Sequence, residues 1–465
     1  MKKIIITLIC LFLLCGCSSV IYEGSVTDGQ SDLTIKDEDK DASYNNAKSL
    51  EVGDDDIYIT SAGTYTLTGE LNGAVIVEVS KDEEVQLVLD NVTINNDGIN
   101  CIYIKEADKV TITLADGSVN TLTDTSTYTM IDDNDVDATI FSKADLVING
   151  SGTLNINANY KHGIVSKDDL IITSGTYNID SVGQGICGKD CLKISDGQFN
   201  ITSSGDALKS NNDEDTSKGF IYITGGTFNI NSLGDGIYGI NLVNIEGGTF
   251  NIKTTKNSTN SSFKGIKSDL SITISSGTFD INVADDGIHS DGDIYISDGE
   301  FTIVSSDDAI HGDGKVTIDG GNFNISAYEG IEGTYITIND GVIYIAANDD
   351  GINAGQKVYT YTPTIEINGG TITIVMGQGD TDAIDSNGYI YVNGGTIDIT
   401  AQSAFDYDSG AEYNGGTIIV NGTQVNTITN QMMGGQMGGQ MGGQQTGGQP
   451  SAPSGNMPGG FAGRR

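Results

Sequence analysis

Apolar and polar residues alternate in short segments that recur throughout the chain. A glycine is followed two positions later by an aromatic or aliphatic residue and four positions later by Ile or Val, as in Gly226, Phe228 and Ile230. Alternate residues of a strand face the same side, so this pattern predicts a strand with one buried face and with Asn229 pointing outward. The glycines that begin these segments are Gly152, Gly175, Gly197, Gly226, Gly248, Gly277, Gly299, Gly321, Gly341, Gly370, Gly395 and Gly416.

Each repeat contains two further short strands. One precedes the glycine, as in residues 294–296 (Ile-Tyr-Ile), and a third follows a Gly/Ala-Ile/Leu pair, as in residues 287–290 (Gly-Ile-His-Ser). Three strands in about 22 residues, separated by Gly, Asn and Asp, predict an all-β chain that forms a right-handed single-stranded parallel β-helix. A helical solenoid is excluded because no 3.6-residue period occurs. A β-propeller is disfavoured because its blades need roughly 40 residues each.

The chain divides into four predicted segments. Residues 1–17 contain two lysines, an apolar run and Cys-Gly-Cys, which is the order of a bacterial lipoprotein signal peptide with Cys17 as the lipidated residue. An uncleaved membrane anchor is the alternative. Residues 18–49 are polar and predict a flexible tether, residues 50–430 form the β-helix, and residues 431–465, rich in Gly, Gln and Met, predict a disordered tail. We therefore expect a lipid-anchored protein on the extracytoplasmic face of the cell membrane, at the cell surface.

The net charge indicates the class of ligand, and the cysteine count indicates whether disulfides hold the fold together. The chain has 63 acidic and 23 basic residues and a formal net charge of -40, which disfavours nucleic acid and favours cations as ligands. Three cysteines lie outside the leader, namely Cys101, Cys187 and Cys191. An odd number cannot form a disulfide framework. We interpret Cys187 and Cys191 as buried or bridged structural residues, with half a zinc site as the alternative.

The third strand of each repeat carries the candidate binding residues. Its inward position is small in every repeat, as at Ser290 and Gly312, whereas its outward neighbour is often basic, aromatic or acidic. A packed core has no need of such an outward set. We therefore predict a carbohydrate-binding column at Lys209, Tyr238, Lys267, His289 and His311.

Acidic residues recur beside the same strand. Neighbouring coils lie about 4.8 Å apart, and two carboxylates at that distance repel by roughly 3 kcal/mol at an effective dielectric constant of 20. A calcium ion, which binds oxygen atoms at about 2.3–2.6 Å, could reach a carboxylate from each coil. The alternative is that these are ordinary Asp-Gly turns whose side chains satisfy backbone groups. The predicted metal ligands are Asp206, Asp235, Asp285, Asp286, Asp307, Asp308, Asp349, Asp350, Asp382 and Asp385.

Several of these segments carry a resemblance to a known family. Residues 206–210 with the acidic insertion that follows, residues 285–290 and residues 382–386 resemble secreted carbohydrate-binding β-helix proteins of the pectate-lyase-like superfold. The resemblance spans roughly residues 55–429. It implies calcium within the helix and binding of cellulose-type or polygalacturonate-type polysaccharide without demonstrated cleavage.

Three functions remain open at this point. The first is a monomeric binder of extracellular polysaccharide that touches the membrane only through its lipid, and we favour it. The second is a surface adhesin or spacer without a sugar ligand. The third is a calcium-dependent polysaccharide lyase, which would need Lys209 or Lys267 as its base because the two arginines, Arg464 and Arg465, lie outside the repeats. We therefore favour a chain without enzymatic activity and leave a pectate-lyase-type activity as the open alternative.

Overall fold

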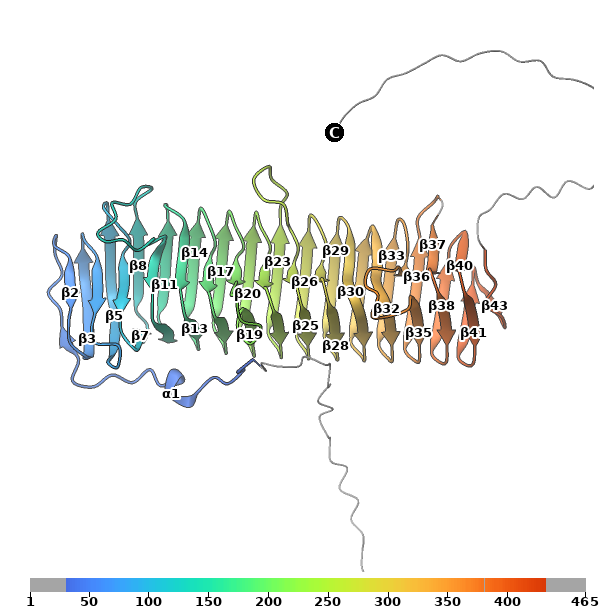
Figure 1. Cartoon of the computed structure of the whole chain (residues 1–465), viewed down its shortest axis with the longest axis horizontal. Helices are drawn as coiled ribbons and strands as arrows, with labels where there is room; N and C mark the ends of the chain where they lie inside the picture. Colours follow the sequence, from blue (N-terminus) through green and yellow to red (C-terminus); the bar gives the residue numbers. More distant parts are fainter. Residues whose placement is uncertain (1–30, 380, 432–465) are drawn as a thin grey trace, which may run out of the picture. The chain divides into compact units, whose positions relative to one another are not determined.

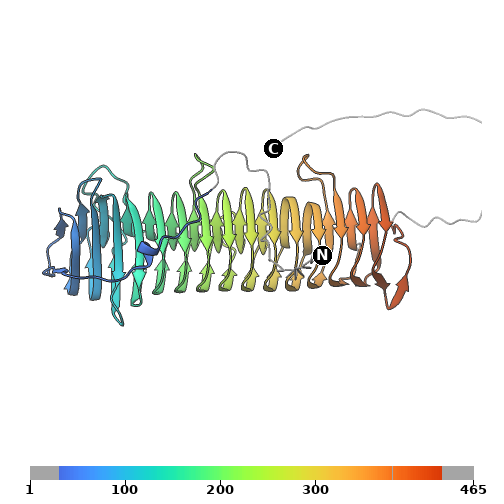
Figure 2. The same ribbon diagram turned by 90° about the horizontal axis from the view of Figure 1, so that it is seen from below.

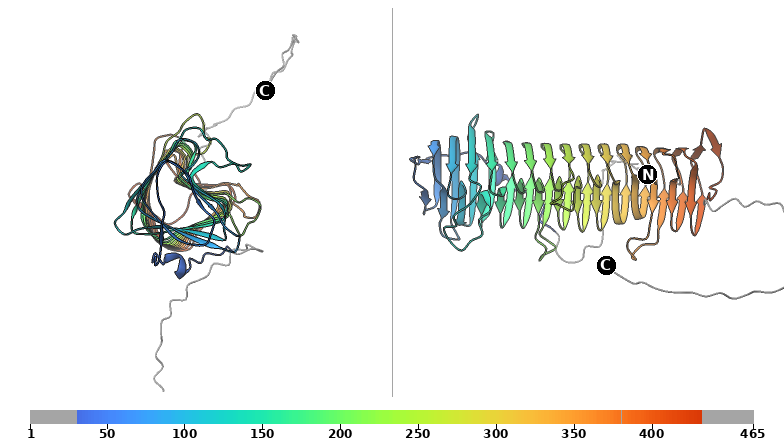
Figure 3. Two further views of the ribbon diagram at one scale, coloured as in Figure 1. Left: turned by 90° about the vertical axis from the view of Figure 1, so that its left-hand side faces the viewer. Right: turned by 90° about the horizontal axis from the view of Figure 1, so that it is seen from above.

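The computed structural model describes residues 31–379 and 381–431, and in this part of the chain nearly all regular structure is β. The strands pair in parallel, each with its counterpart in the next coil, so the fold is the expected parallel β-helix (Figure 1). In end view the coils superpose and outline three faces, which we name A, B and C (Figure 3). The predicted leader with Cys17, the first part of the tether and the tail from residue 432 lie outside the described residues.

Face A holds the strands that follow the recurring glycines. They are β8 (Val119–Asp124), β11 (Thr153–Ala158), β14 (Thr176–Ser181), β17 (Gln198–Ser203), β20 (Thr227–Ser232), β23 (Thr249–Thr254), β26 (Thr278–Val283), β29 (Glu300–Ser305), β31 (Asn322–Ala327), β33 (Val342–Ala347), β36 (Thr371–Met376), β39 (Thr396–Thr400), β42 (Thr417–Val420) and β43 (Thr423–Val425). Only the last of these, β43, pairs antiparallel with its neighbour, and it folds back on β42 at the end of the described coils.

Face B holds the strands that precede the glycines. They are β1 (Lys48–Ser49), β3 (Gly63–Leu71), β5 (Glu84–Asn96), β7 (Lys109–Leu114), β10 (Asp145–Gly150), β13 (Asp169–Ile172), β16 (Cys191–Ile194), β19 (Phe220–Ile223), β22 (Leu242–Ile245), β25 (Ser271–Ile274), β28 (Asp293–Ile296), β35 (Thr364–Ile367), β38 (Tyr389–Val392) and β41 (Gly410–Tyr413). The long strand β5 continues around the corner and also pairs with β8 of face A.

Face C holds the third strands. They are β2 (Ile57–Ile59), β4 (Val75–Glu78), β6 (Ile102–Glu106), β9 (Ala138–Ser142), β12 (His162–Ser166), β15 (Ile186–Gly188), β18 (Leu208–Ser210), β21 (Ile237–Gly239), β24 (Ile266–Ser268), β27 (Ile288–Ser290), β30 (Asp308–Ile318), β32 (Glu329–Ile338), β34 (Ile352–Ala354), β37 (Asp382–Ser386) and β40 (Ser403–Tyr407). Two of them, β30 and β32, run on into face B.

Aromatic rings form a continuous stack inside face A. In-register pairing places one ring above the next, with centroids 4.5–4.8 Å apart and nearly parallel planes. Each stacked pair adds about 0.5–1.5 kcal/mol beyond the area that it buries. The preceding glycine is needed for this stack: Gly248 has φ +125°, and a Cβ there would lie 3.0 Å from the Phe250 ring. The stack consists of Tyr177, Phe199, Phe228, Phe250, Phe279, Phe301 and Phe323.

Residues 31–49, which we predicted to belong to a flexible tether, instead lie against the outside of face B (Figure 2). We call this segment the strap; it contains α1 (Asp37–Lys40) and ends in β1, which pairs with β3. Leu33 and Ile35 pack against Phe220 and Tyr222. Tyr222 therefore keeps only 8% of its surface accessible, although it lies on the outer side of β19. The short apolar alternation of the strap explains why it docks where a purely polar segment would not.

The described residues also include the three cysteines that lie outside the predicted leader. Cys101, Cys187 and Cys191 are all buried and free, so they are structural residues without a bridge. In the part of the chain that the structure describes, no helix has the length and apolar character needed to cross a membrane.

Candidate functional site on face C

Parallel pairing stacks one outward residue of each coil in a single column on face C. The register joins Lys209 to Tyr238, Lys267 to His289 and His289 to His311, in the order that the sequence predicts. We call this set the face C column. From β18 to β37 it comprises Lys209, Tyr238, Lys267, His289, His311, Glu332, Asn353 and Asp385.

The first three members of the column form a compact group. The ammonium groups of Lys209 and Lys267 lie 4.8 and 4.4 Å from the centroid of the Tyr238 ring. Lys209 also lies 2.7 Å from Asp206, and Lys267 lies 3.6 Å from Asp269. The Tyr238 hydroxyl donates to Asp269 at 3.0 Å. Each lysine therefore acts as the counter-charge of a carboxylate while it contacts the ring.

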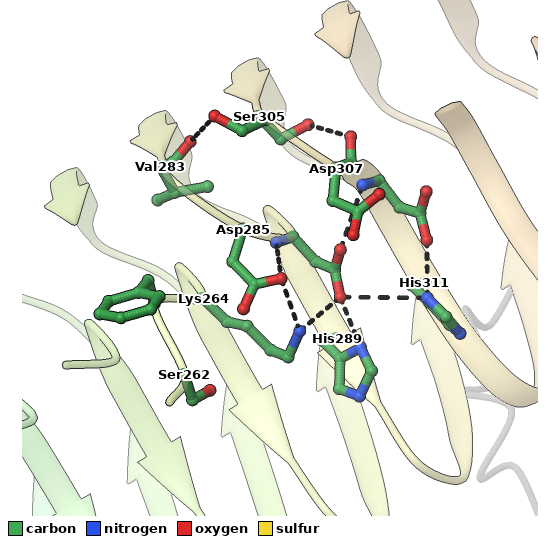
Figure 4. A network of polar contacts seen from close by, with 12 residues as sticks. Ser262, Lys264, Val283, Asp285, His289, Ser305, Asp307 and His311 are labelled. Carbon is green, nitrogen blue, oxygen red and sulfur yellow. Dashed lines mark hydrogen bonds and ion pairs between the residues drawn. The ribbon is translucent and has the colours of Figure 1, made fainter. Parts of the chain in front are cut away.

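Lys264, His289 and His311 belong to one charge network (Figure 4), and the buried carboxylate of Asp286 is its centre. This carboxylate is 3% exposed and lies 2.6 Å from the ammonium group of Lys264 and 2.8 Å from Nδ1 of His289. It also accepts a hydrogen bond from the backbone N–H of Asp308 in the next coil. Burial raises the pKa of Asp286, but the hydrogen bond from His289 and the charge of Lys264 outweigh it and hold the pKa well below its ordinary value.

His311 connects this network to the next coil. Its Nδ1 lies 2.6 Å from Asp308 and 3.2 Å from Glu332, whose other oxygen lies 2.8 Å from the ammonium group of Lys357. Burial lowers the pKa of His311, but the hydrogen bond to Asp308 and the charge of Glu332 raise it to about 9. The carboxylates around His311 therefore favour its protonated form.

Further along face C the carboxylates lack such partners. Among the described residues, no Lys, Arg or His lies within 4.0 Å of the carboxylates of Glu329, Asp350 or Asp385. Burial raises the pKa of Glu329 to about 7, and the nearby Glu332 adds to this effect. Burial and the charge of Asp385 raise the pKa of Asp350 to about 7, and burial with the charge of Asp406 raises that of Asp385 to about 6.

Comparison with known proteins places these coils in a family. The sequence model of a family described as carbohydrate-binding domain-containing protein matches residues 53–309 and 306–440. The chain belongs to this family. A protein of the same description from Acetivibrio thermocellus is 38% identical over 168 residues, which are 36% of this chain and 59% of that protein. The chain thus matches less than two thirds of that relative's length.

One solved structure is also similar to this chain. It is described as the polysaccharide lyase-like protein from C. thermocellum in a gadolinium derivative. The sequences are 23% identical, and the match covers 82% of this chain and 93% of that chain with a TM-score of 0.26. A likeness at this TM-score carries no argument about function.

Four groups in the described part of the chain each bring three ligand atoms within 4.8 Å of one another. Three of the groups lie on face C and draw on Asp285, Asp286, Asp307, Asp308, His289, His311 and Glu332. In these groups Lys264, His289 and His311 already place nitrogen atoms 2.6–3.0 Å from carboxylate oxygens. They therefore fit a divalent cation less well than the sequence suggests.

The fourth group was not predicted from the sequence. It joins Asp145, Asp168 and Asp169 on face B, and no Lys, Arg or His of the described residues lies within 4.0 Å of their carboxylates. Burial raises the pKa of Asp145 to about 6, and the charges of Asp169 and Asp168 add to this. The sequence did contain a signal for this group, because Asp145 and Asp169 begin equivalent strands of successive coils.

Several of the predicted metal ligands already bind donors of the protein itself. Asp235 is 2% exposed and accepts hydrogen bonds from the Ser262 hydroxyl at 2.7 Å and the Lys264 backbone N–H at 2.8 Å. Asp206 accepts from the backbone N–H of Asp235, and Asp350 accepts from that of Asp382. One oxygen of each of these three carboxylates thus serves the corner of the coil, as the turn interpretation requires. Asp307 is exposed and Asp349 is half-buried.

Proposed function

We propose that the protein binds an extracellular polysaccharide along its coils while a lipid on Cys17 holds it at the cell surface. The observation that carries the proposal is the family match, which spans residues 53–440 and therefore nearly the whole β-helix. The coils themselves, and no appended domain, are thus the part of the chain that corresponds to the carbohydrate-binding domain. Sugar chains are repetitive polymers, and a solenoid offers the same groups once per coil.

Face C supplies groups suited to an acidic polysaccharide. The column carries imidazole, ammonium, phenol and amide groups in successive coils, and each can bond a sugar hydroxyl or carboxylate. A chain with a net charge of -40 repels uronates, so binding of a pectin-like polymer requires bridging cations. This requirement is the reason for including calcium in the proposal.

We place the calcium where the carboxylates have no basic partner. Glu329, Asp350 and Asp385 on face C, and the group around Asp145 on face B, supply hard oxygen ligands of the kind that calcium binds. The raised pKa values support this placement, since they show that the negative charges there are costly without a cation. A bound calcium ion would neutralise these carboxylates and offer open coordination positions to a uronate.

Affinity electrophoresis of the full chain tests the proposal. The gels contain polygalacturonate, a soluble neutral β-glucan or no glycan, each with calcium or with a chelator. We expect retardation by at least one glycan, and retardation by polygalacturonate only when calcium is present. If no glycan retards the protein under any condition, the proposed function is wrong and a role as a spacer or adhesin without a sugar ligand takes its place.

A further inference from the structure

Tyrosines gather on the outer surface of face B in the last third of the coils, where Figure 1 shows β32, β35 and β38 side by side. Tyr335 and Tyr389 occupy the same column, with Thr364 between them. Tyr391 lies two residues beyond Tyr389, and their rings stack with centroids 6.0 Å apart and planes inclined by 15°. Tyr389 is 39% exposed, and Tyr335 and Tyr391 are half-buried.

Contacts with neighbouring side chains fix the orientation of the Tyr335 ring. The Tyr335 hydroxyl donates to Glu366 at 2.9 Å, and the ammonium group of Lys315 lies 5.1 Å from the centroid of the Tyr335 ring. Tyr361, from the connection between β34 and β35, meets Tyr335 edge to face with centroids 6.2 Å apart. A ring held in this way loses little conformational entropy when a ligand stacks on it.

A ladder of exposed amides runs beside the tyrosines. Asn368 donates to Asn339 at 2.8 Å, Asn393 to Asn368 at 2.8 Å and Asn414 to Asn393 at 2.9 Å. A side-chain amide has two N–H donors and two acceptor lone pairs, so a single ladder bond leaves bonding capacity toward the solvent. The surface therefore combines aromatic rings with a row of donors and acceptors at the coil spacing.

Aromatic residues on the earlier coils of face B are covered by an extended chain. There, Phe220 and Tyr222 are covered by an extended segment of the chain itself, the strap, through Leu33 and Ile35. The strap runs along the row of coils, across successive strands (Figure 2). An extended polymer laid over the aromatic residues of this face is thus already part of the structure.

Charge selects among the possible polymers. Asp293, Asp319, Glu366 and Glu412 lie on or beside this part of face B, against the single ammonium group of Lys315 on the same strands. An anionic chain would be repelled here, whereas a neutral one would not. Tyr335 and Tyr389 are two coils apart, about 9.6 Å from the usual strand spacing, which is close to the length of two linked pyranose units.

We infer that Tyr335, Tyr389 and Tyr391, with the amide ladder beside them, form a second glycan-binding surface for a neutral polysaccharide of pyranose units. The C–H faces of the sugars stack on the rings, and the sugar hydroxyls bond the amides. This inference rests on the proposed function and deepens it, because it assigns neutral polysaccharide to a named surface on face B that needs no calcium.

The test compares a triple variant, Tyr335→Ala with Tyr389→Ala and Tyr391→Ala, with the parent chain. Hydroxyethyl cellulose is the neutral probe, and polygalacturonate with calcium is the acidic one. We expect the triple variant to bind hydroxyethyl cellulose at least about tenfold more weakly, because truncating a buried tyrosine contact commonly costs that much. Binding of polygalacturonate should stay within about twofold.

Two controls isolate the role of the rings. Tyr344→Ala removes a tyrosine that is 41% exposed on face A, and binding should stay at the parent level. Tyr335→Phe keeps the ring and loses only the bond to Glu366, so binding should fall less than threefold. If the triple variant does not fold, Tyr389→Ala alone replaces it in the test, because Tyr389 is the most exposed of the three tyrosines. This single substitution should by itself weaken binding of hydroxyethyl cellulose.

The outcomes separate the two proposals. If the parent binds hydroxyethyl cellulose and the tyrosine variants bind it equally well, the inference is overturned while the proposed function stands. If the variants lose polygalacturonate instead, the assigned ligand class is wrong. If the parent binds no glycan at all, both proposals fail together.

Discussion

Asp286 and Asp350 stand at equivalent corners of their coils, each followed by Gly and Ile, yet their surroundings shift their pKa values in opposite directions. Lys264 and His289 hold the pKa of Asp286 low, whereas burial and the charge of Asp385 raise that of Asp350 to about 7. Similar residues in a repeat thus carry opposite electrostatic roles. Ionised Asp286 stabilises the fold through its contacts with Lys264 and His289. Ionised Asp350 destabilises the fold, because its charge is partly buried and lies near that of Asp385.

This contrast gives a pH prediction. Because the folded-state pKa of Asp350 lies above its value in the unfolded chain, its contribution to stability is complete below about pH 4 and is lost as the pH rises through about 7. In chelator, Asp350→Asn should therefore stabilise the protein at pH 8, by about 1–2 kcal/mol, and leave it nearly unchanged at pH 4. Melting curves across this pH range measure the effect.

Calcium gives the same experiment a second readout. Calcium should raise the melting temperature of the parent at pH 8, and the double variant Glu329→Gln with Asp350→Asn should respond less. Asp286→Asn is the matched control, since it removes the buried carboxylate that Lys264 and His289 share, and it should destabilise the protein at pH 8. Parent melting curves that are the same with calcium and with chelator would refute the calcium proposal.

At the scale of single residues, the sequence predicted where the side chains of the face C column lie better than it predicted what they contact. The repeat fixed the order of Lys267, His289 and His311 in one column, and the register confirms it. It did not reveal that both histidines contact buried aspartates, because the partners depend on how the side chains turn at each corner. Lys264 was missed because it follows an insertion between β23 and β24 that interrupts the repeat. Whether the column binds sugar stays a prediction.

At the scale of the strand, the aromatic stack of face A is the most regular element. Phe250 lies between Phe228 and Phe279, with ring centroids 4.7 and 4.8 Å away. Phe250→Ala would leave a cavity with rings on both sides, so we expect a loss of about 3–5 kcal/mol. Denaturant unfolding measures this loss. Asn251→Ala, on the outer side of the same strand, should change stability by less than about 0.5 kcal/mol.

The two variants are informative only as a pair. If Phe250→Ala lowers the free energy of unfolding no more than Asn251→Ala does, the stack is not a major source of stability. The inward position would then only tolerate an aromatic residue. This element was predictable because a period of two and a fixed repeat length determine both the face and the register. The strap was not, because two apolar residues at Leu33 and Ile35 are too short a pattern to distinguish from a linker.

At the scale of the whole described chain, the strap links distant coils. It joins β3 at one end and the surface of β16 and β19 at the other. Leu33→Asp with Ile35→Asp should release it, because two carboxylates would replace the contacts with Phe220 and Tyr222. We expect faster amide exchange over β19 and earlier proteolysis within the strap.

Lys36→Ala is the control for the strap, since the Lys36 side chain is 67% exposed and its loss should leave the segment docked. Unchanged exchange over β19 in the double aspartate variant would mean that the strap does not protect this face. Glycan binding by the tyrosines further along face B should be the same in both variants, because the strap covers other strands.

The position of the strap also has a consequence for the order of events during synthesis. Lys193 donates a hydrogen bond to the backbone of Thr34, a residue 159 positions earlier in the chain. At the usual rate of about 5–20 residues per second, the strap therefore waits about 8–32 s after its own synthesis before this partner exists. The early coils can close before Thr34 docks, because each coil contacts only its neighbours. The residues around Thr34 therefore reach their place on face B only after the strands up to β16 have been synthesised, whereas β1, at the other end of the strap, can pair with β3 as soon as the first coils form.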